Sequence, residues 1–248
     1  MGREFEGHNE VELDATPEQV WEAIATGPGI DSWFMGRNDV EPGEGGTVRT
    51  AFGGYTPEST VTAWEPQKRF AYHSGEAEDG RFIAYEFLIE GRDQGSTVLR
   101  TVTSGFLPGD DWESEYDAMT KGGAMFFRTL VEYLTHFAGR TATPITAFGP
   151  SVTDWEQAWT VLHGELGLTG AVTAGDRVRF AADGLAPIDG VVYFVNPHTL
   201  GVRTSDALYR FFRGLQGGMV VMHHVFADDT DPTETEGAWQ SWLTSTFG

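Results

Sequence analysis

The sequence predicts an α+β fold in which an antiparallel sheet wraps around a long helix, and it predicts that this unit occurs twice. Three observations support the prediction. Strand-length runs follow one another between turn residues in residues 40–105. A segment with helical periodicity, residues 113–137, comes directly after them. The same order of features then returns in shorter form in the second half of the chain.

The first elements are a strand and a helix. Residues 5–14 alternate apolar and polar side chains, as a half-buried strand does. The Thr-Pro-Glu motif at residues 16–18 supplies an N-cap and a proline in the first turn, so a helix begins there. We expect the helix to end at the Gly-Pro-Gly of residues 27–29, before a turn that presents Trp33 and Phe34.

Short loops join the next strands, which indicates an antiparallel meander. In the fourth strand the alternate residues Ile83, Tyr85 and Phe87 are apolar, while Glu86 lies on the other face. One side of the sheet is therefore expected to be buried. The five predicted strands are residues 47–52, 59–64, 69–73, 81–89 and 97–104.

Residues 113–137 are expected to form one long amphipathic helix that covers the buried face of the sheet. Its apolar face carries Tyr116, Met119, Gly123, Phe126, Phe127, Leu130, Leu134 and Phe137. In the middle of a helix, Gly122 and Gly123 each lower helix stability by about 1 kcal/mol relative to alanine. Their presence therefore calls for a structural explanation. Two reasons are open: close packing against the sheet, or room for a ligand. By periodicity Gly123 lies on the buried face, where we expect it to enlarge a cavity.

The chain is predicted to hold two domains, residues 1–140 and 141–248, with the Gly-, Thr- and Pro-rich residues 139–150 at the boundary. Each short stretch of similar sequence between the two halves is weak evidence by itself. The stretches occur in the same order in both halves, which indicates a degenerate duplication. We expect a smaller or filled cavity in the second copy. The similar stretches are residues 153–159 with 16–21, 175–180 with 45–49, 208–211 with 84–87 and 217–221 with 95–99, followed by a closing helix over residues 233–247.

Composition excludes several kinds of partner. The 37 acidic and 16 basic residues give a net charge of −21, which repels nucleic-acid phosphates and anionic membrane surfaces. No apolar run reaches the roughly 20 residues of a membrane helix. There are no cysteines, and the first ten residues are polar and unlike a signal peptide, so a cytoplasmic location is expected.

No metal or cofactor is predicted. The seven histidines are scattered, and only His223 and His224 are adjacent. On a strand these two would point to opposite faces, one into the interior and one into solvent, so they are not expected to share a metal. The acidic residues 228–231 lack the glycine and final glutamate of a calcium loop and are interpreted as a solvated turn. Nucleophile, phosphate-loop and dinucleotide motifs do not occur either, so no residue is predicted to be catalytic.

The aromatic residues have two possible roles, which are a plain core and the wall of a ligand pocket with a few polar groups. Tyr72, Tyr85 and Thr101 would supply those polar groups. Glu86 and Arg100 are expected to pair across strands on the exposed face. The candidate ligand-binding residues are Trp33, Phe34, Phe52, Tyr72, Ile83, Tyr85, Phe87, Thr101, Met119, Gly123, Phe126 and Phe127.

Three stretches resemble the SRPBCC or START-like helix-grip superfamily, in its branch of bacterial homologues of the activator of the heat-shock chaperone ATPase. They are residues 16–21 with the following Trp33-Phe34, residues 61–72 and residues 95–106. The resemblance covers residues 5–137 directly and the rest through the internal repeat. It implies a helix-grip fold with a cavity between the sheet and its long C-terminal helix. Members of the superfamily bind lipids or cyclise polyketides, so the fold does not fix the function.

Three functions are compatible with these features. The first is binding of an apolar or aromatic small molecule in the cavity, without bond-breaking chemistry. The second is a polyketide cyclase or dehydratase that uses acid–base groups in the cavity, which requires Tyr72, His73 or Tyr85 to point inward. The third is a protein-interaction or chaperone-modulating module whose acidic surface engages a basic protein partner.

Overall fold

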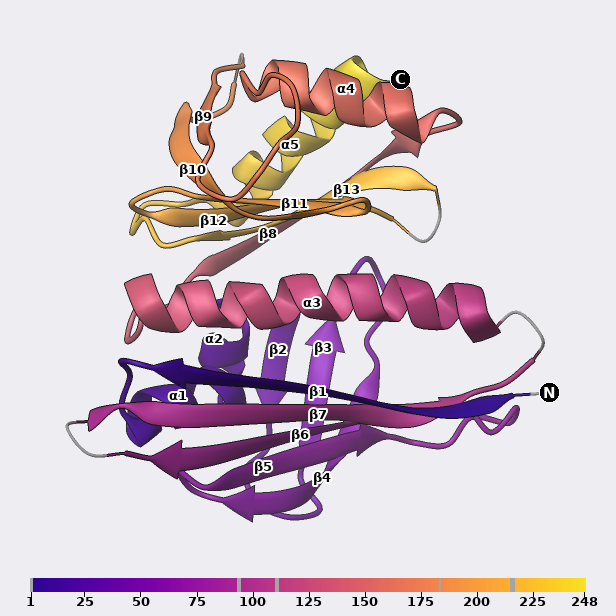
Figure 1. The fold of residues 1–248 in the computed structure, drawn as a ribbon, viewed down its shortest axis with the longest axis vertical. Coiled ribbons are helices and arrows are strands. Elements are labelled where there is room, and N and C mark those ends of the chain that lie inside the picture. The colour runs from indigo at the N-terminus through magenta and orange to yellow at the C-terminus, as the bar shows by residue number, and fades with distance from the viewer. Residues whose placement is uncertain (1, 93–94, 110–111, 183, 215–216) are drawn as a thin grey trace. The chain divides into compact units, whose positions relative to one another are not determined.

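The computed structural model describes residues 2–92, 95–109, 112–182, 184–214 and 217–248. The chain divides into two compact units, Met1–Thr141 and Ala142–Gly248, and each unit has its own antiparallel sheet (Figure 1). In the part of the chain described, no helix has the length and apolar character needed to cross a membrane.

The first unit is a seven-stranded sheet in the order β1-β7-β6-β5-β4-β3-β2. Its long helix runs alongside β1 and β7 (Figure 1). The helices are α1 (Pro17–Ala25), α2 (Gly27–Ile30) and α3 (Trp112–His136). The strands are β1 (Arg3–Leu13), β2 (Arg37–Val40), β3 (Thr47–Ala51), β4 (Glu58–Glu65), β5 (Arg69–Ser74), β6 (Phe82–Gly91) and β7 (Thr97–Leu107).

Helix α1 begins where its capping signal predicts. Thr16 accepts a hydrogen bond from the backbone of Gln19, and the Gln19 side chain accepts one from the Thr16 backbone. The buried face of α1 places Trp21 against Trp64 and Phe70, at ring-centroid distances of 5.0 and 6.1 Å. The helix therefore packs on the face of the sheet formed by β4 and β5.

The Gly-Pro-Gly segment forms the short helix α2 instead of ending the first helix in a loop. Thr26 caps it, because its hydroxyl oxygen accepts a hydrogen bond from Gly29 N at 3.0 Å. A side chain at Gly29 would clash with the carbonyl oxygen of Glu22. These glycines therefore allow close packing of two helices rather than marking a loop.

Two strands were not predicted from the sequence. Strand β2 is only four residues long and is mostly polar. Strand β8 (Thr143–Ser151) occupies the segment that the sequence assigns to the domain boundary. Its two prolines and one glycine suggest a turn, but β8 lies at a sheet edge and pairs only with β13 (Gly218–Val225). An edge strand tolerates proline because one row of its backbone groups has no strand partner.

The second unit repeats the topology of the first. Its six-stranded sheet has the order β8-β13-β12-β11-β10-β9, which matches β1-β7-β6-β5-β4-β3 strand for strand. Within its described residues it has no counterpart of α2 or β2. The predicted duplicated α+β helix-grip fold is therefore confirmed. The remaining elements are α4 (Trp155–Glu165), β9 (Arg177–Phe180), β10 (Ile188–Asn196), β11 (Thr199–Arg203), β12 (Ala207–Arg213) and α5 (Pro232–Phe247).

Indole rings of α5 fill the inner face of the second sheet. Trp239 stacks on Phe180 of β9 at 5.8 Å, and Trp242 lies 5.4 Å from Trp239. Tyr209 and Phe211 of β12 belong to the same buried cluster. The second unit thus has an inner face packed by its own side chains.

The adjacent histidines of β13 differ from the prediction. Alternation places them on opposite faces, but both are only 1% exposed, so neither points into solvent. His223 packs against Tyr209 and Trp239, and its Nδ1 accepts a hydrogen bond from the backbone N–H of Arg210 at 3.1 Å. Alternation fixes the face of a side chain but not whether that face is covered. Among the described residues, no group of three or more metal-ligating side chains is placed to hold an ion.

Candidate functional site

The first sheet has an inner face that the helices cover. Strand register places Phe70 opposite Phe87 and Tyr72 opposite Tyr85, so these four rings share one face. Trp21 of α1 contacts this face through Phe70, and Phe34, which follows α2, contacts it through Tyr85. The other face carries Arg69, Ala71 and His73 of β5 by the same alternation.

Half of the predicted site residues form one network of rings on the inner face. Phe34 lies 4.8 Å from Phe126 of α3 and 6.5 Å from Tyr85. Trp33 lies 6.4 Å from Phe87, and Tyr72 lies 5.2 Å from Tyr85. The indole N–H of Trp33 donates to the carbonyl oxygen of Ala23 at 2.9 Å, which fixes the ring. The network joins α3 to β5 and β6 through the segment after α2.

Two phenol groups in this network lack polar partners. Neither the Tyr72 nor the Tyr85 hydroxyl makes a hydrogen bond to another described residue. Burial raises the pKa of both phenols, and Tyr85 adds to the rise in the pKa of Tyr72. Both hydroxyls therefore remain protonated donors at physiological pH. A ligand oxygen that accepts from one of these hydroxyls would contribute about 1 kcal/mol per hydrogen bond.

The third predicted polar group, Thr101 of β7, is buried on the same face. Its hydroxyl oxygen accepts a hydrogen bond from the side-chain amide of Asn9 at 3.3 Å. Asn9 on β1 is a polar residue of the inner face that sequence reasoning missed. Its position directly opposite Thr101 would have revealed it only once the β1–β7 register was known.

The other predicted residues lie at the margins of the ring network. Ile83, Met119 and Phe127 are half-buried, on β6 and α3. Phe52 is half-buried at the tip of the β3–β4 hairpin, where it bridges to Tyr55. A ligand contact at these four positions stays a proposal.

Gly123 is exposed, so the prediction that it lies on the buried face of α3 is wrong. A Cβ atom built there would have no neighbour within 4 Å, which contradicts close packing as its reason. Leu130 and Leu134, on the following turns, are buried. Periodicity identifies the side of a helix that faces the sheet, but not how closely the sheet approaches.

The predicted cross-strand pair of Glu86 and Arg100 does not form. Register places Glu86 opposite Val102 and Arg100 opposite Leu88. Glu86 instead pairs with Arg69 at 2.7 Å, and Arg100 pairs with Glu10 and Glu90. All of these groups lie away from the inner face, as expected, but the choice of partners depends on a register that the sequence does not show.

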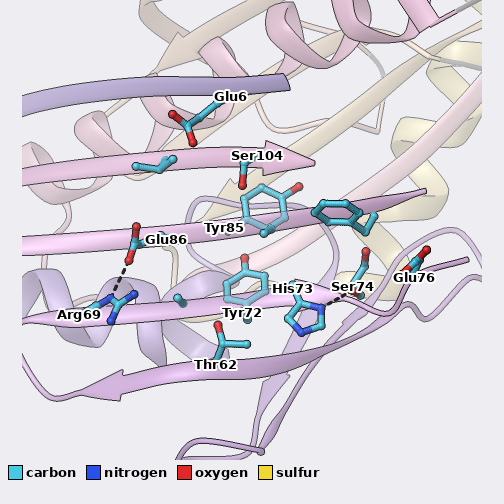
Figure 2. Close-up of a pocket in the computed structure, with 14 residues that line it drawn as sticks. Glu6, Thr62, Arg69, Tyr72, His73, Ser74, Glu76, Tyr85, Glu86 and Ser104 are labelled. Carbon is cyan, nitrogen blue, oxygen red and sulfur yellow. Dashed lines mark hydrogen bonds and ion pairs between the residues drawn. The ribbon is translucent and has the colours of Figure 1, made fainter. Parts of the chain in front are cut away.

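An open groove lies on the opposite, outer face of the first sheet (Figure 2). Its volume is about 520 Å³. The groove crosses β4, β5, β6, β7 and β1, and sequence reasoning did not anticipate it. The groove is lined by all three candidate acid–base groups, His73, Tyr72 and Tyr85, but strand alternation puts the His73 side chain on the face opposite those of Tyr72 and Tyr85.

The sheet gripped by a long helix, present twice, defines a helix-grip protein of the SRPBCC or START-like type. The family model described as "Activator of Hsp90 ATPase homolog 1-like protein" matches residues 14–135, which lie within the N-terminal unit. No match was found among curated proteins.

Solved structures resemble either one unit or the whole chain. Protein MLL2253 from Mesorhizobium loti is 25% identical, with 52% of this chain and 96% of that chain covered and a TM-score of 0.45. The Aha1 dimer from Colwellia psychrerythraea is 24% identical over 52% and 96%, with a TM-score of 0.42. The di-domain aromatase/cyclase BexL from the BE-7585A biosynthetic pathway is 11% identical and covers 98% of both chains, with a TM-score of 0.45. Since all three TM-scores are below 0.5, the duplication rests on the strand order of the two sheets.

Proposed function

We propose that the first unit binds an uncharged, apolar or aromatic small molecule on the inner face of its sheet, beside Phe126 of α3. One observation carries the proposal: Tyr72 and Tyr85 place two hydroxyl donors without partners among aromatic rings. A pocket with apolar walls and a few convergent polar groups is the usual form of a small-molecule site.

The chemistry of the phenols narrows the ligand class. Because burial holds both phenols neutral, they favour a ligand with carbonyl or ether oxygens over a cation. The ring network contains no charged side chain, so a charged ligand would lose its hydration without gaining a counter-ion.

Titration with Nile red, an uncharged aromatic ketone whose fluorescence responds to polarity, tests the proposal. We expect saturable binding to the full chain and roughly 30-fold weaker binding to the Tyr72→Phe/Tyr85→Phe variant, since each of the two lost hydrogen bonds costs about 1 kcal/mol. Tyr55→Phe is the matched control because Tyr55 is 69% exposed. Equal affinity in all three proteins would contradict a site on the inner face.

An enzyme of the cyclase or dehydratase type is the second candidate, because the two phenols that point inward meet its geometric requirement. With a raised pKa, each phenol is suited to donate a proton and is a poor base. His73 lies on the opposite face and cannot serve in the same site. A cytoplasmic location and a basic protein partner stay predictions.

A further inference from the structure

The groove on the outer face of the first sheet is built by differences in side-chain size. Ala71 of β5, Ala84 of β6 and Ser104 of β7 are small lining residues, and by register they are neighbours on the outer face, where they form the floor of the groove. The larger Phe82 and Glu86 stand before and after Ala84 on the same face of β6. The resulting hollow of about 520 Å³ lies within the usual size range of small-molecule sites, about 300–1,000 Å³.

Oriented polar groups surround this floor. The Nε of Arg69 donates to a carboxylate oxygen of Glu86 at 2.7 Å, which holds both side chains at one side of the groove. The Nδ1–H of His73 donates to the carbonyl oxygen of Ser74 at 2.5 Å, so Nε2 of the neutral ring is left as an acceptor. The hydroxyl groups of Ser104 and Thr62 add groups that both donate and accept (Figure 2).

The charges in the groove favour a neutral ligand. Glu86 is paired with Arg69, and Glu6 contacts Nε2 of His8 at 2.8 Å. Glu76 is the remaining carboxylate of the lining, and it is exposed at the rim. An anion would be repelled by these three carboxylates, while a cation would have to displace an existing pair to reach two of them.

We propose that the outer groove is a second binding site, for a neutral saccharide of one or two rings. Vicinal hydroxyl groups of a sugar can accept from Arg69 while they donate to Glu86, so the ion pair serves as a two-sided hydrogen-bonding group. The C–H face of the sugar ring would lie on Ala71, Ala84 and the ring of Phe82. This site differs from the proposed inner site because the side chains of Ala71, Ala84 and Ser104 lie on the other face of the sheet, although Tyr72 and Tyr85 also border the groove.

The test is a series of amide NMR titrations of the full chain with glucose, galactose, N-acetylglucosamine and maltose. We expect at least one of these sugars to shift the amide signals of Ala71, Ala84 and Ser104 with millimolar affinity. If none of the four shifts these signals, the proposal is wrong. Spermidine serves as the cationic probe: stronger shifts with spermidine, lost at high salt, would also overturn it.

Two variants with matched controls locate the site. Ala84→Leu fills the floor and should abolish the sugar-induced shifts, whereas Ala51→Leu, on exposed β3 outside the groove, should keep them. Arg69→Gln should weaken binding about tenfold. Arg49→Gln is its control, because Arg49 makes an equivalent 2.7 Å pair with Glu58 elsewhere in the sheet. If Ala84→Leu leaves the sugar affinity unchanged, the groove is not the site.

Nile red binding separates the two proposals. Ala84→Leu should leave Nile red affinity unchanged, which also shows that the variant is folded. Loss of sugar binding with intact Nile red binding is the expected result. Loss of both together with an unchanged melting temperature would contradict the independence of the two sites.

Discussion

At the scale of single residues, His223 shows how burial ties stability to pH. Its Nδ1 accepts a backbone hydrogen bond, so the proton lies on Nε2, for which no hydrogen-bond partner is found among the described residues. The ring of Trp239, 4.4 Å away, offers only a weak π acceptor. Burial, together with the positive charge of Arg210, lowers the pKa of His223 well below its usual value. The histidine is therefore held neutral in the folded state.

The expected consequence is acid sensitivity of the second unit. Because the folded pKa lies below the unfolded value of 6.5, the unfolded state takes up the proton first as the pH falls. The contribution of His223 to the free energy of unfolding is fully present above pH 6.5. As the pH falls below 6.5, that free energy should decrease by up to about 1.4 kcal/mol per pH unit. Urea unfolding of His223→Gln, which keeps an acceptor but cannot titrate, should show a flatter pH profile. His8→Gln, at an exposed site, should behave like the native chain; a native profile in both variants would contradict the assignment.

At the scale of elements, α3 carries two glycines at positions where another residue would make the helix more stable. A Cβ atom at Gly122 or Gly123 would have no neighbour within 4 Å. We expect Gly122→Ala and Gly123→Ala each to stabilise the chain by about 0.5–1 kcal/mol in denaturant unfolding. Gly29→Ala is the opposite control, because its side chain would clash with Glu22 and should destabilise.

A larger side chain at the same position separates stability from binding. Gly123→Leu should keep both the native melting temperature and the native Nile red affinity, because Gly123 is exposed and a Cβ atom there has no neighbour within 4 Å. A large drop in melting temperature would show that Gly123 is needed for packing after all. Weaker Nile red binding would instead show that the bound ligand reaches Gly123.

The elements also show what the sequence can and cannot predict. The period of residues 81–89 and the capping signal at Thr16 predicted β6 and α1, because both signals are local. Strand β8 was missed because its edge position, which makes its prolines tolerable, is a property of the whole sheet. The partners of Glu86 and the outer groove depend on register, which brings side chains from several strands together. Half of the candidate residues predicted from the sequence thus lie in the inner ring network, while the groove was not predicted as a site although Tyr72, His73 and Tyr85 line it.

At the scale of the whole molecule, strand β8 decides where the second unit begins. Its backbone pairs with β13 along one edge, and on the other edge Gln240 of α5 makes two hydrogen bonds to Phe148, at 3.2 Å to the nitrogen and 2.6 Å to the oxygen. Glu236 accepts a further bond from Thr146 N at 3.2 Å. The side chains of α5 therefore occupy backbone groups of an edge strand that would otherwise be free to pair with another chain.

We propose that the units fold separately and that the boundary lies before β8. Residues 142–248 should then give a dispersed amide NMR spectrum and cooperative unfolding, because the edge strand and its contacts with α5 are retained. Residues 152–248 should not fold, since β13 loses its partner strand and Gln240 its backbone contacts. Residues 1–141 should fold as well, because β1 to α3 form a complete sheet and helix. If residues 152–248 fold as stably as residues 142–248, β8 is a linker and not part of the second unit.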